Sequence, residues 1–149
     1  MTDAEYTAYC GLYCLDCIPS NRKFFAIARE LQELLAELQF EEYAKLKAES
    51  NETFTSYPRF AQVLQEIIAL ECPGPCRAGG GKTNCSIRAC VLSRNYEGCW
   101  ECDSWEGCEL LARLKGIHTN LEYHIGLIRK EGLGNWSAKR RRHYRWQAR

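Results

Sequence analysis

The chain has 149 residues, of which 10 are cysteine, a thiol content well above that of an ordinary intracellular domain. Hydrophobic residues make up 46% and charged residues 26%, which are normal globular proportions and exclude disorder throughout the chain. The length suits one domain with a core but is too short for a barrel enzyme or for most two-domain enzymes. No apolar run approaches the roughly 18–20 residues needed to span a bilayer.

The N-terminus predicts a cytoplasmic protein that does not associate with a membrane. The opening residues Met1-Thr2-Asp3-Ala4-Glu5 are acidic and lack the basic and apolar regions of a signal peptide. Because the cytoplasm keeps thiols reduced, we do not expect the cysteines to form a disulfide framework.

The cysteine-free stretch 18–71 predicts a helical hairpin. Ser20 or Asn21 is a suitable N-cap for a first helix, and residues 41–48 either continue that helix or form a short second one. Pro58 suits the first turn of a later helix. Apolar residues at three- and four-residue spacing place one stripe on each long helix: Phe24, Ile27, Ala28, Leu31, Leu34, Leu35 and Leu38, then Phe60, Val63, Leu64, Ile67 and Ile68. We expect these stripes to pack inside the hairpin; a ligand groove or a dimer seam is the alternative.

The stretch 72–108 looks irregular. It contains Pro73, Pro75 and several glycines, its apolar content is low, and no periodicity persists. A 37-residue irregular stretch inside a compact domain needs something to hold it, and its seven cysteines point to metal. Beyond it, Leu110, Leu111 and Leu114 predict a helix that ends near Gly116. Thr119 is a candidate cap for another helix that ends near Gly132, with four inward residues: Leu121, His124, Ile125 and Ile128.

The fold class that follows is mainly α, with a helical hairpin and C-terminal helices around an irregular cysteine-rich metal-knuckle region and little β structure. We expect a single cysteine-rich helical metal-binding domain over residues 1–136. Residues 137–149 are expected to form a basic C-terminal tail or helix, because they hold six basic residues and no acidic ones.

The cysteines have the spacing of metal ligands. Cys14-Leu15-Asp16-Cys17 and Cys99-Trp100-Glu101-Cys102 are both C-x2-C pairs, in which a tight turn aims two sulfurs at one ion. The looser pairs Cys72-x3-Cys76 and Cys85-x4-Cys90 also fit. We expect zinc in two four-cysteine sites that use eight of the ten cysteines: Cys10, Cys14, Cys17, Cys72, Cys76, Cys85, Cys90, Cys99, Cys102 and Cys108.

Spacing does not decide which pairs share an ion. One ribbon-like arrangement joins the pair Cys72 and Cys76 with the pair at 99 and 102. The pairs at 14–17 and at 85–90 then form the other site, and Cys10 or Cys108 can replace any of these. His118, His124 and His143 lack cysteine neighbours at ligand spacing and are interpreted as ordinary surface or core histidines.

Other motifs in the sequence suggest three alternative cofactors. The spacing of Cys10, Cys14 and Cys17 matches the cluster loop of radical S-adenosylmethionine enzymes, but the chain lacks their βα barrel. Another kind of iron–sulfur cluster, or a thiol redox protein, stays open because four cysteines also bind iron clusters. The run 79–83 resembles the end of a phosphate loop, but the required first glycine is Cys76 and no strand precedes it.

The cysteine motifs also resemble a known family. Cys10-Gly11-Leu12-Tyr13-Cys14-x2-Cys17 is one half of the resemblance, and Cys85-Ser86-Ile87-Arg88-Ala89-Cys90 followed by Cys99-x2-Cys102 and Cys108-Glu109-Leu110 is the other. Over about residues 8–115 the chain is similar to an uncharacterised prokaryotic cysteine-rich family, the domain of unknown function number 3795. The resemblance implies metal binding and supplies no reaction.

The C-terminal run Lys139–Arg149 mixes basic and aromatic residues, a mixture that binds phosphates and stacks bases. Nucleic acid is therefore one candidate partner. The competing interpretation is a solvated terminus, or a segment whose Tyr144 and Trp146 dock on the acidic N-terminal half. Residues 1–71 hold 6 basic and 12 acidic side chains, which favours such docking.

The sequence thus predicts a protein that binds metal, with zinc the expected ion and an iron–sulfur or thiol redox protein the alternative. The cysteine sites are expected to be structural and to support the binding of an unidentified macromolecular partner. No catalytic constellation can be identified, which argues against an enzyme. Arg88, between two cysteines, is a candidate either for activating a thiolate or for hydrogen bonding to a metal-bound sulfur.

Overall fold

The computed structural model describes residues 2–147 and divides them into two compact units. The cysteine-rich unit comprises the described residues 2–20 and 72–147, and the helical unit comprises residues 21–71. Both consist of helices, turns and loops, so the prediction of a mainly α fold is confirmed. In the described range, β pairing is limited to two isolated bridges, Thr7 with Tyr13 and His118 with Tyr144. The predicted boundary at residue 136 stays a prediction; residues 137–147 belong to the cysteine-rich unit.

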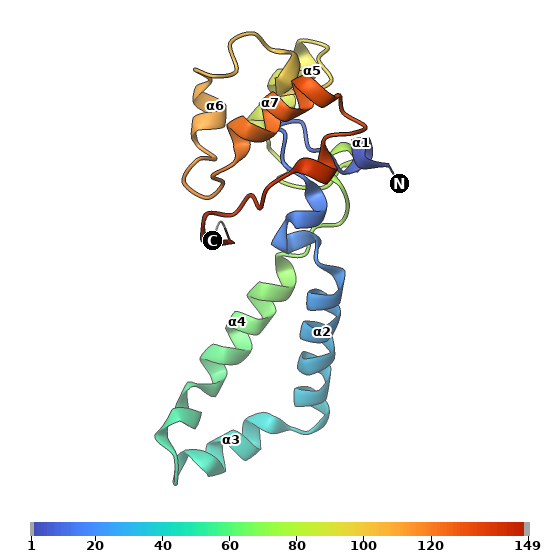
Figure 1. Cartoon of the computed structure of the whole chain (residues 1–149). Helices are drawn as coiled ribbons and strands as arrows, with labels where there is room; N and C mark the ends of the chain where they lie inside the picture. The colour runs from blue at the N-terminus through green and yellow to red at the C-terminus, as the bar shows by residue number, and fades with distance from the viewer. Residues whose placement is uncertain (1, 148–149) are drawn as a thin grey trace. The chain divides into compact units, whose positions relative to one another are not determined.

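The helical unit is built from α2 (Arg22–Glu37), α3 (Phe40–Ala48), the 3-10 turn η3 (Glu52–Ser56) and α4 (Tyr57–Ala69). The side chain of Asn21 caps α2 by accepting a hydrogen bond from the Phe24 N–H at 3.1 Å, and Pro58 lies in the first turn of α4, as predicted. α3 is a separate helix because Gln39 adopts a left-handed conformation with φ 50°, which ends α2. α2 and α4 lie side by side as an antiparallel hairpin (Figure 1).

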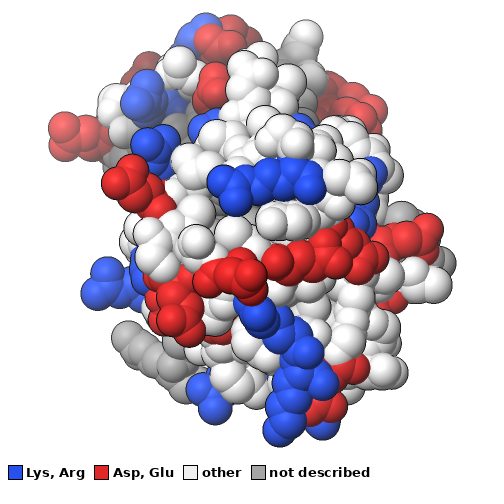
Figure 2. Space-filling view, turned by 90° about the horizontal axis from the view of Figure 1, so that it is seen from above, with Lys and Arg blue, Asp and Glu red and all other residues white. Residues whose placement is uncertain are grey.

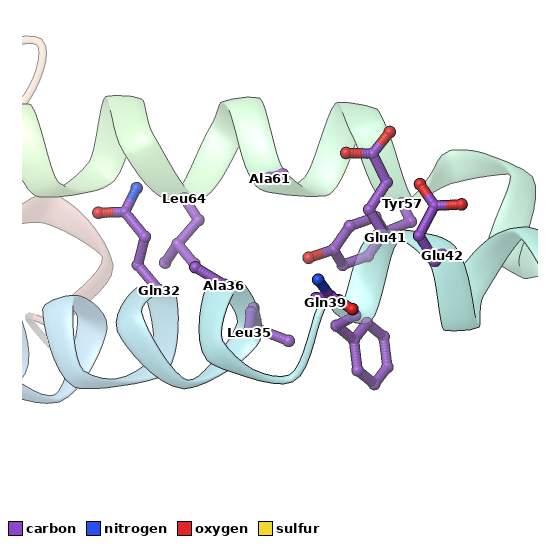
Figure 3. Close-up of a pocket in the computed structure, with 10 residues that line it drawn as sticks. Gln32, Leu35, Ala36, Gln39, Glu41, Glu42, Tyr57, Ala61 and Leu64 are labelled. Carbon is purple, nitrogen blue, oxygen red and sulfur yellow. The ribbon is translucent and has the colours of Figure 1, made fainter.

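The hairpin interior is thin. Leu35 of α2 and Ala61 and Leu64 of α4 line a cavity of about 470 Å³ between the two helices (Figure 3). Of the apolar residues in this unit, those that are buried are Phe25, Ala28, Ala44 and Leu64.

Most of the apolar stripe on α2 is exposed, so its predicted place inside the hairpin is wrong for five residues. These residues are 41–69% exposed: Phe24, Ile27, Leu31, Leu34 and Leu38. The prediction is also wrong for Phe60 and Val63 of the α4 stripe, which are 46% and 44% exposed. Two antiparallel helices cover only one strip of each other, and α2 carries an apolar arc wider than that strip.

The cysteine-rich unit has shorter elements. They are α1 (Asp3–Tyr6), η1 (Cys14–Asp16), η2 (Ile18–Ser20), η4 (Cys76–Ala78), α5 (Ser86–Ser93), η5 (Cys99–Glu101), α6 (Glu109–Ala112), α7 (Leu121–Glu131), η6 (Ser137–Lys139) and η7 (Arg145–Gln147). Residues 86–93, expected to be irregular, form α5. Asn120, and not Thr119, occupies the N-cap position of α7. The helix considered for residues 137–149 is replaced in the described part by the turns η6 and η7.

The core of the cysteine-rich unit surrounds α7. Trp136, Ile125 and His124 are fully buried. The indole N–H of Trp136 donates to the Thr7 hydroxyl at 2.9 Å, which ties the two ends of the described chain together. The cluster also contains residues from the stretch expected to lack a core: Ile87, Val91, Cys99 and Trp100. None of the described helices combines the length and the apolar character needed to cross a membrane.

Candidate metal centre

The N-terminal cysteines lie on a loop that the core positions. Cys14 and Cys17 flank η1, and the Cys17 N–H donates to the Cys14 carbonyl at 3.1 Å, so the C-x2-C pair forms the expected tight turn. Tyr13, just before it, is buried and donates to the Asp3 carboxylate at 2.7 Å. Gly11 has φ +85°, and a Cβ there would lie 3.0 Å from the Ile125 side chain, so the loop passes close to α7.

The pair Cys72 and Cys76 follows the helical unit in the sequence and lies beside the N-terminal cysteine loop. The Cys72 N–H donates to the Pro19 carbonyl at 2.8 Å, which holds the start of the loop 72–81 against the N-terminal segment. The loop then folds back so tightly that a Cβ at Gly80 would lie 1.7 Å from the Gly74 carbonyl oxygen. Only glycine fits at position 80 without moving the backbone.

These two segments form the first thiol set, which we define as Cys14, Cys17, Cys72 and Cys76. Burial, with a smaller contribution from the nearby Cys76, Cys17 and Cys72 thiols, raises the pKa of Cys14 to about 11. Burial likewise raises the pKa of Cys17, with Cys72 as a neighbour. The structure therefore brings together two cysteine pairs that are separated by more than 50 residues in the sequence.

Hydrogen-bond donors point at three sulfurs of the first thiol set. The Cys76 N–H donates to Cys14 Sγ at 3.5 Å, and the Gly81 N–H donates to Cys72 Sγ at 3.0 Å. The hydroxyl oxygen of Tyr144 accepts from the Ile18 N–H at 3.1 Å and lies 3.3 Å from Cys17 Sγ, so its own proton is available to that sulfur. At Cys14 and Cys17 such donors favour the anionic thiolate, which is the form that binds metal. The Cys72 thiol also donates a hydrogen bond of its own, to the Gly74 carbonyl at 2.9 Å.

Arg88 holds the glycine-rich loop. Its guanidinium donates to the carbonyls of Gly80 at 2.9 Å, Lys82 at 2.8 Å and Thr83 at 3.0 Å, and more distantly to that of Cys76 at 3.4 Å. Its hydrogen bonds thus go to carbonyl oxygens, which differs from the predicted bond to a sulfur. Through these bonds Arg88 fixes the backbone that aims the Gly81 N–H at Cys72.

The second thiol set, defined as Cys90, Cys99, Cys102 and Cys108, lies between α5, η5 and α6. Burial raises the pKa of Cys99 to about 12, and the nearby thiols of Cys108, Cys90, Cys102 and Cys85 add to this. The guanidinium of Arg94 lies near Cys90 and Cys102, whose negative charge raises the pKa of Arg94.

Two cysteines lie outside these sets. Cys10 is near Cys76 of the first set and Cys99 of the second, with Cys85 also close, and burial raises its pKa strongly. Cys85 occupies the N-cap position of α5. The ten thiols thus form two neighbourhoods with Cys10 between them.

The pairing in the structure differs from the ribbon-like arrangement considered from the sequence. Cys72 and Cys76 lie with Cys14 and Cys17, not with the pair at 99 and 102. Loop spacing could not reveal this, because the contact between Cys72 and Pro19 depends on where the segment 21–71 leaves and re-enters the unit. Within residues 2–147, no three His, Cys, Asp or Glu side chains are grouped closely enough to hold one metal ion.

The basic C-terminal segment docks on the first C-x2-C turn. The Arg140 guanidinium makes a two-point ion pair with Asp16, at 2.5 and 2.9 Å, and lies over the Tyr13 ring at 4.3 Å. Lys139 pairs with Glu131 at 2.7 Å, and Tyr144 is buried. Two of the basic side chains considered for nucleic acid, Lys139 and Arg140, therefore form ion pairs inside the unit. On the face in Figure 2, basic and acidic side chains are intermixed.

The histidines line the inner side of this segment. His124 and His143 are buried, and the pKa of each falls to about 4, chiefly because burial disfavours the charged ring. The Arg141 N–H donates to His124 Nε2 at 3.1 Å, so this histidine is neutral and holds the docked segment. The sequence suggests that Tyr144 docks on the N-terminal half, but no local spacing marks its contact with Cys17 or the roles of Asp16 and Gly80.

Residues 6–113, well over half of the chain, match the sequence profile of a family described as protein of unknown function (DUF3795). The chain belongs to this family. No curated protein and no solved structure matches the chain.

Proposed function

We propose that the protein binds zinc through two sets of four cysteines and that the metal holds the cysteine-rich unit in the shape that a macromolecular partner recognises. The first thiol set would bind one ion and the second thiol set the other. Zinc is the natural ion for four thiolates, which it takes tetrahedrally with no open position. Bound there, it would supply cross-links between segments and no reaction.

The observation that carries the proposal is that hydrogen-bond donors lie at three of the four sulfurs of the first thiol set, those of Cys14, Cys17 and Cys72. Four thiols without metal gain little from such donors, whereas four thiolates need them to disperse negative charge. The donors come from Gly81, Cys76 and Tyr144, which are fixed by the Arg88 bonds, by η4 and by the docked C-terminal segment, respectively.

The donor set also fits the family assignment. The match over residues 6–113 contains all ten cysteines, so both thiol sets lie in the part of the chain that the family shares. The region that the sets would cross-link is rich in loops and short turns, and such regions are commonly stabilised by structural zinc.

Elemental analysis of the protein purified without added metal or chelator tests the proposal. We expect about two zinc ions per chain, with no visible absorbance from anaerobic preparations. Cys14→Ser should lose one ion and Cys102→Ser the other, while Cys85→Ser, outside both sets, should keep both. Iron with visible absorbance would replace this proposal by an iron–sulfur protein. Fewer than one metal per chain together with intact disulfides would overturn it.

A further inference from the structure

An apolar face of the helical unit is uncovered within that unit. On α2 the five exposed apolar residues recur at alternating spacings of three and four, which is the a/d pattern of a coiled-coil seam. On α4 the same spacing recurs over Phe60, Val63, Ile67 and Leu70, and three of these are 44–63% exposed. A regular a/d seam packs against another helix and not against a small ligand.

Both seams point to the same side of the hairpin. Each seam lies about 110° around its helix from the contact strip, and in an antiparallel pair these rotations bring both seams to one face. The structure agrees, because Leu31 of α2 and Phe60 of α4 line one apolar hollow of about 400 Å³. Its other apolar walls are Leu35, Phe40, Phe54 and Tyr57. The seam face is defined as the eight exposed residues Phe24, Ile27, Leu31, Leu34, Leu38, Phe60, Val63 and Leu70.

The helical unit lacks a sufficient core of its own. Of its buried apolar residues, two are alanines, and the others are Phe25 and Leu64. A segment of about 50 residues needs a larger buried surface, or a second chain, to be stable. Four of the large apolar side chains of α2, Phe24, Ile27, Leu31 and Leu34, lie on the seam face, so covering that face would supply the missing core.

We propose that the seam face binds the seam face of a second copy of this chain, so that two hairpins form a four-helix bundle. At about 150–200 Å² of total surface for each large apolar side chain, eight that are about half exposed present roughly 700 Å² per copy. Two copies then bury roughly 1,400 Å², which lies within the range of stable interfaces. A second copy offers an apolar face of the same length and pattern, and two-fold symmetry makes the contact self-complementary.

Charged residues beside the seams allow the proposed dimer contact to be tested by one variant that should weaken it and one that should strengthen it. Figure 3 shows Gln32 opposite Leu64 and Leu35 near Ala61, which sets the level of α2 against α4. Counted along two antiparallel helices from these two labelled pairs, position 37 falls at the level of position 59, and position 30 at the level of position 66. A two-fold axis parallel to the helices places α2 on α4 of the other copy at this same level. Glu37 then meets the other copy's Arg59, an attractive pair, and Glu30 meets the other copy's Glu66, a repulsive pair.

Sedimentation velocity of the full-length, metal-loaded chain over a concentration series tests the proposal. We expect a dimer for the native protein and a monomer for Leu31→Glu combined with Leu34→Glu. Leu92→Glu, which changes a residue 57% exposed in the cysteine-rich unit, is the matched control and should stay dimeric. Circular dichroism of each variant reports whether helix content is kept.

Two charge variants test the dimer independently, in case the variant that combines Leu31→Glu with Leu34→Glu unfolds. Arg59→Glu should raise the dimer dissociation constant several-fold, and Glu66→Lys should lower it several-fold, because both residues are exposed and neither change removes an apolar contact. A monomeric native protein at high concentration would overturn the proposal. A dimer that is insensitive to both the seam and the charge variants would also overturn it. Metal content in the same samples is a separate readout, so failure here does not depend on the zinc proposal.

Discussion

The two units contrast in how they are held together. The helical unit has long, regular helices but a small interior, in which four apolar residues are buried. The cysteine-rich unit has short helices, turns and loops, yet it contains most of the buried residues, among them Trp136, Leu121 and Ile125. Regular secondary structure and a packed interior are therefore separate properties in this molecule.

The contrast shows what replaces helix packing in the irregular unit. Arginine side chains bridge backbone carbonyls: Arg77 donates to Thr7 and Glu97, both at 2.7 Å, as Arg88 does along the glycine-rich loop. The guanidinium groups thus satisfy carbonyl oxygens in these loops that would be hydrogen-bonded to backbone N–H groups in a helix. The cysteines lie where these loops meet, which is where a metal ion would add most.

Removal of metal should have the largest effect on stability, and it should act on the cysteine-rich unit and not on the helical unit. If zinc is bound as proposed, a strong chelator or Cys14→Ser should unfold much of the cysteine-rich unit, because structural zinc contributes on the order of 10 kcal/mol. Near-ultraviolet circular dichroism should lose the signal of the buried Trp100 and Trp136. Cys85→Ser serves as the control with a similar change of side chain. Full retention of that signal after verified metal loss would show that packing alone holds the unit.

Acidification should also act mainly on the cysteine-rich unit. The pKa values of His124 and His143 are lowered from their usual 6.5 to about 4, so the folded state binds fewer protons than the unfolded state between these values. Stability is thus fully present above pH 6.5 and falls as the pH drops toward 4, by on the order of 2–3 kcal/mol for each histidine.

Urea titrations at a series of pH values, on protein whose metal content is monitored, check this dependence. His143→Gln should flatten the slope between pH 6.5 and 4, whereas a substitution at an exposed lysine such as Lys47 should not. An unchanged slope in the histidine variant would contradict the assignment.

Gly80→Ala should have the next largest effect on stability and on zinc affinity. Its Cβ would lie 1.7 Å from the Gly74 carbonyl, so the loop must move, at a cost of about 3 kcal/mol. The first thiol set should lose zinc affinity at the same time, because the Gly81 N–H shifts away from Cys72. Gly107→Ala meets no atom within 4 Å and is the control. Zinc competition with a chromogenic chelator measures both variants, and equal affinities would count against the role of the loop.

Tyr144→Phe should have the smallest effect. It removes the hydroxyl that links Ile18 N–H and Cys17 Sγ, at a cost of about 1 kcal/mol. We expect faster proteolysis after the arginines of the C-terminal segment and a modest loss of affinity at the first thiol set. Tyr123→Phe, which loses an exposed bond to the Lys139 carbonyl, should change neither. Equal cleavage rates in the two variants would show that Tyr144 does not couple the segment to Cys17.

The helices and the metal-ligand spacing of the cysteines could be predicted from the sequence much better than the packing of these elements. The Asn21 cap, Pro58 and Gly132 were readable because each acts on its own neighbours, and α2, α4 and α7 begin or end beside them. The C-x2-C turns were readable for the same reason. The burial of the α2 stripe was not, because periodicity gives the direction of an apolar face and says nothing of what covers it.

The grouping of cysteines depended on long-range contacts that no local pattern reports. The bond between Cys72 and Pro19 and the ion pair between Arg140 and Asp16 join residues that are 53 and 124 positions apart. The basic C-terminal segment is a charge run in the sequence, but in the fold its Lys139 and Arg140 pair with Glu131 and Asp16. Net charge along the sequence could suggest docking and could not supply its partners.

X-ray absorption at the zinc edge of the purified native protein tests the central claim most directly. The account predicts a first shell of four sulfurs at about 2.3 Å for both ions, with no lighter ligand. Nitrogen or oxygen atoms in that shell, or protein that contains no zinc and has oxidised thiols, would contradict it.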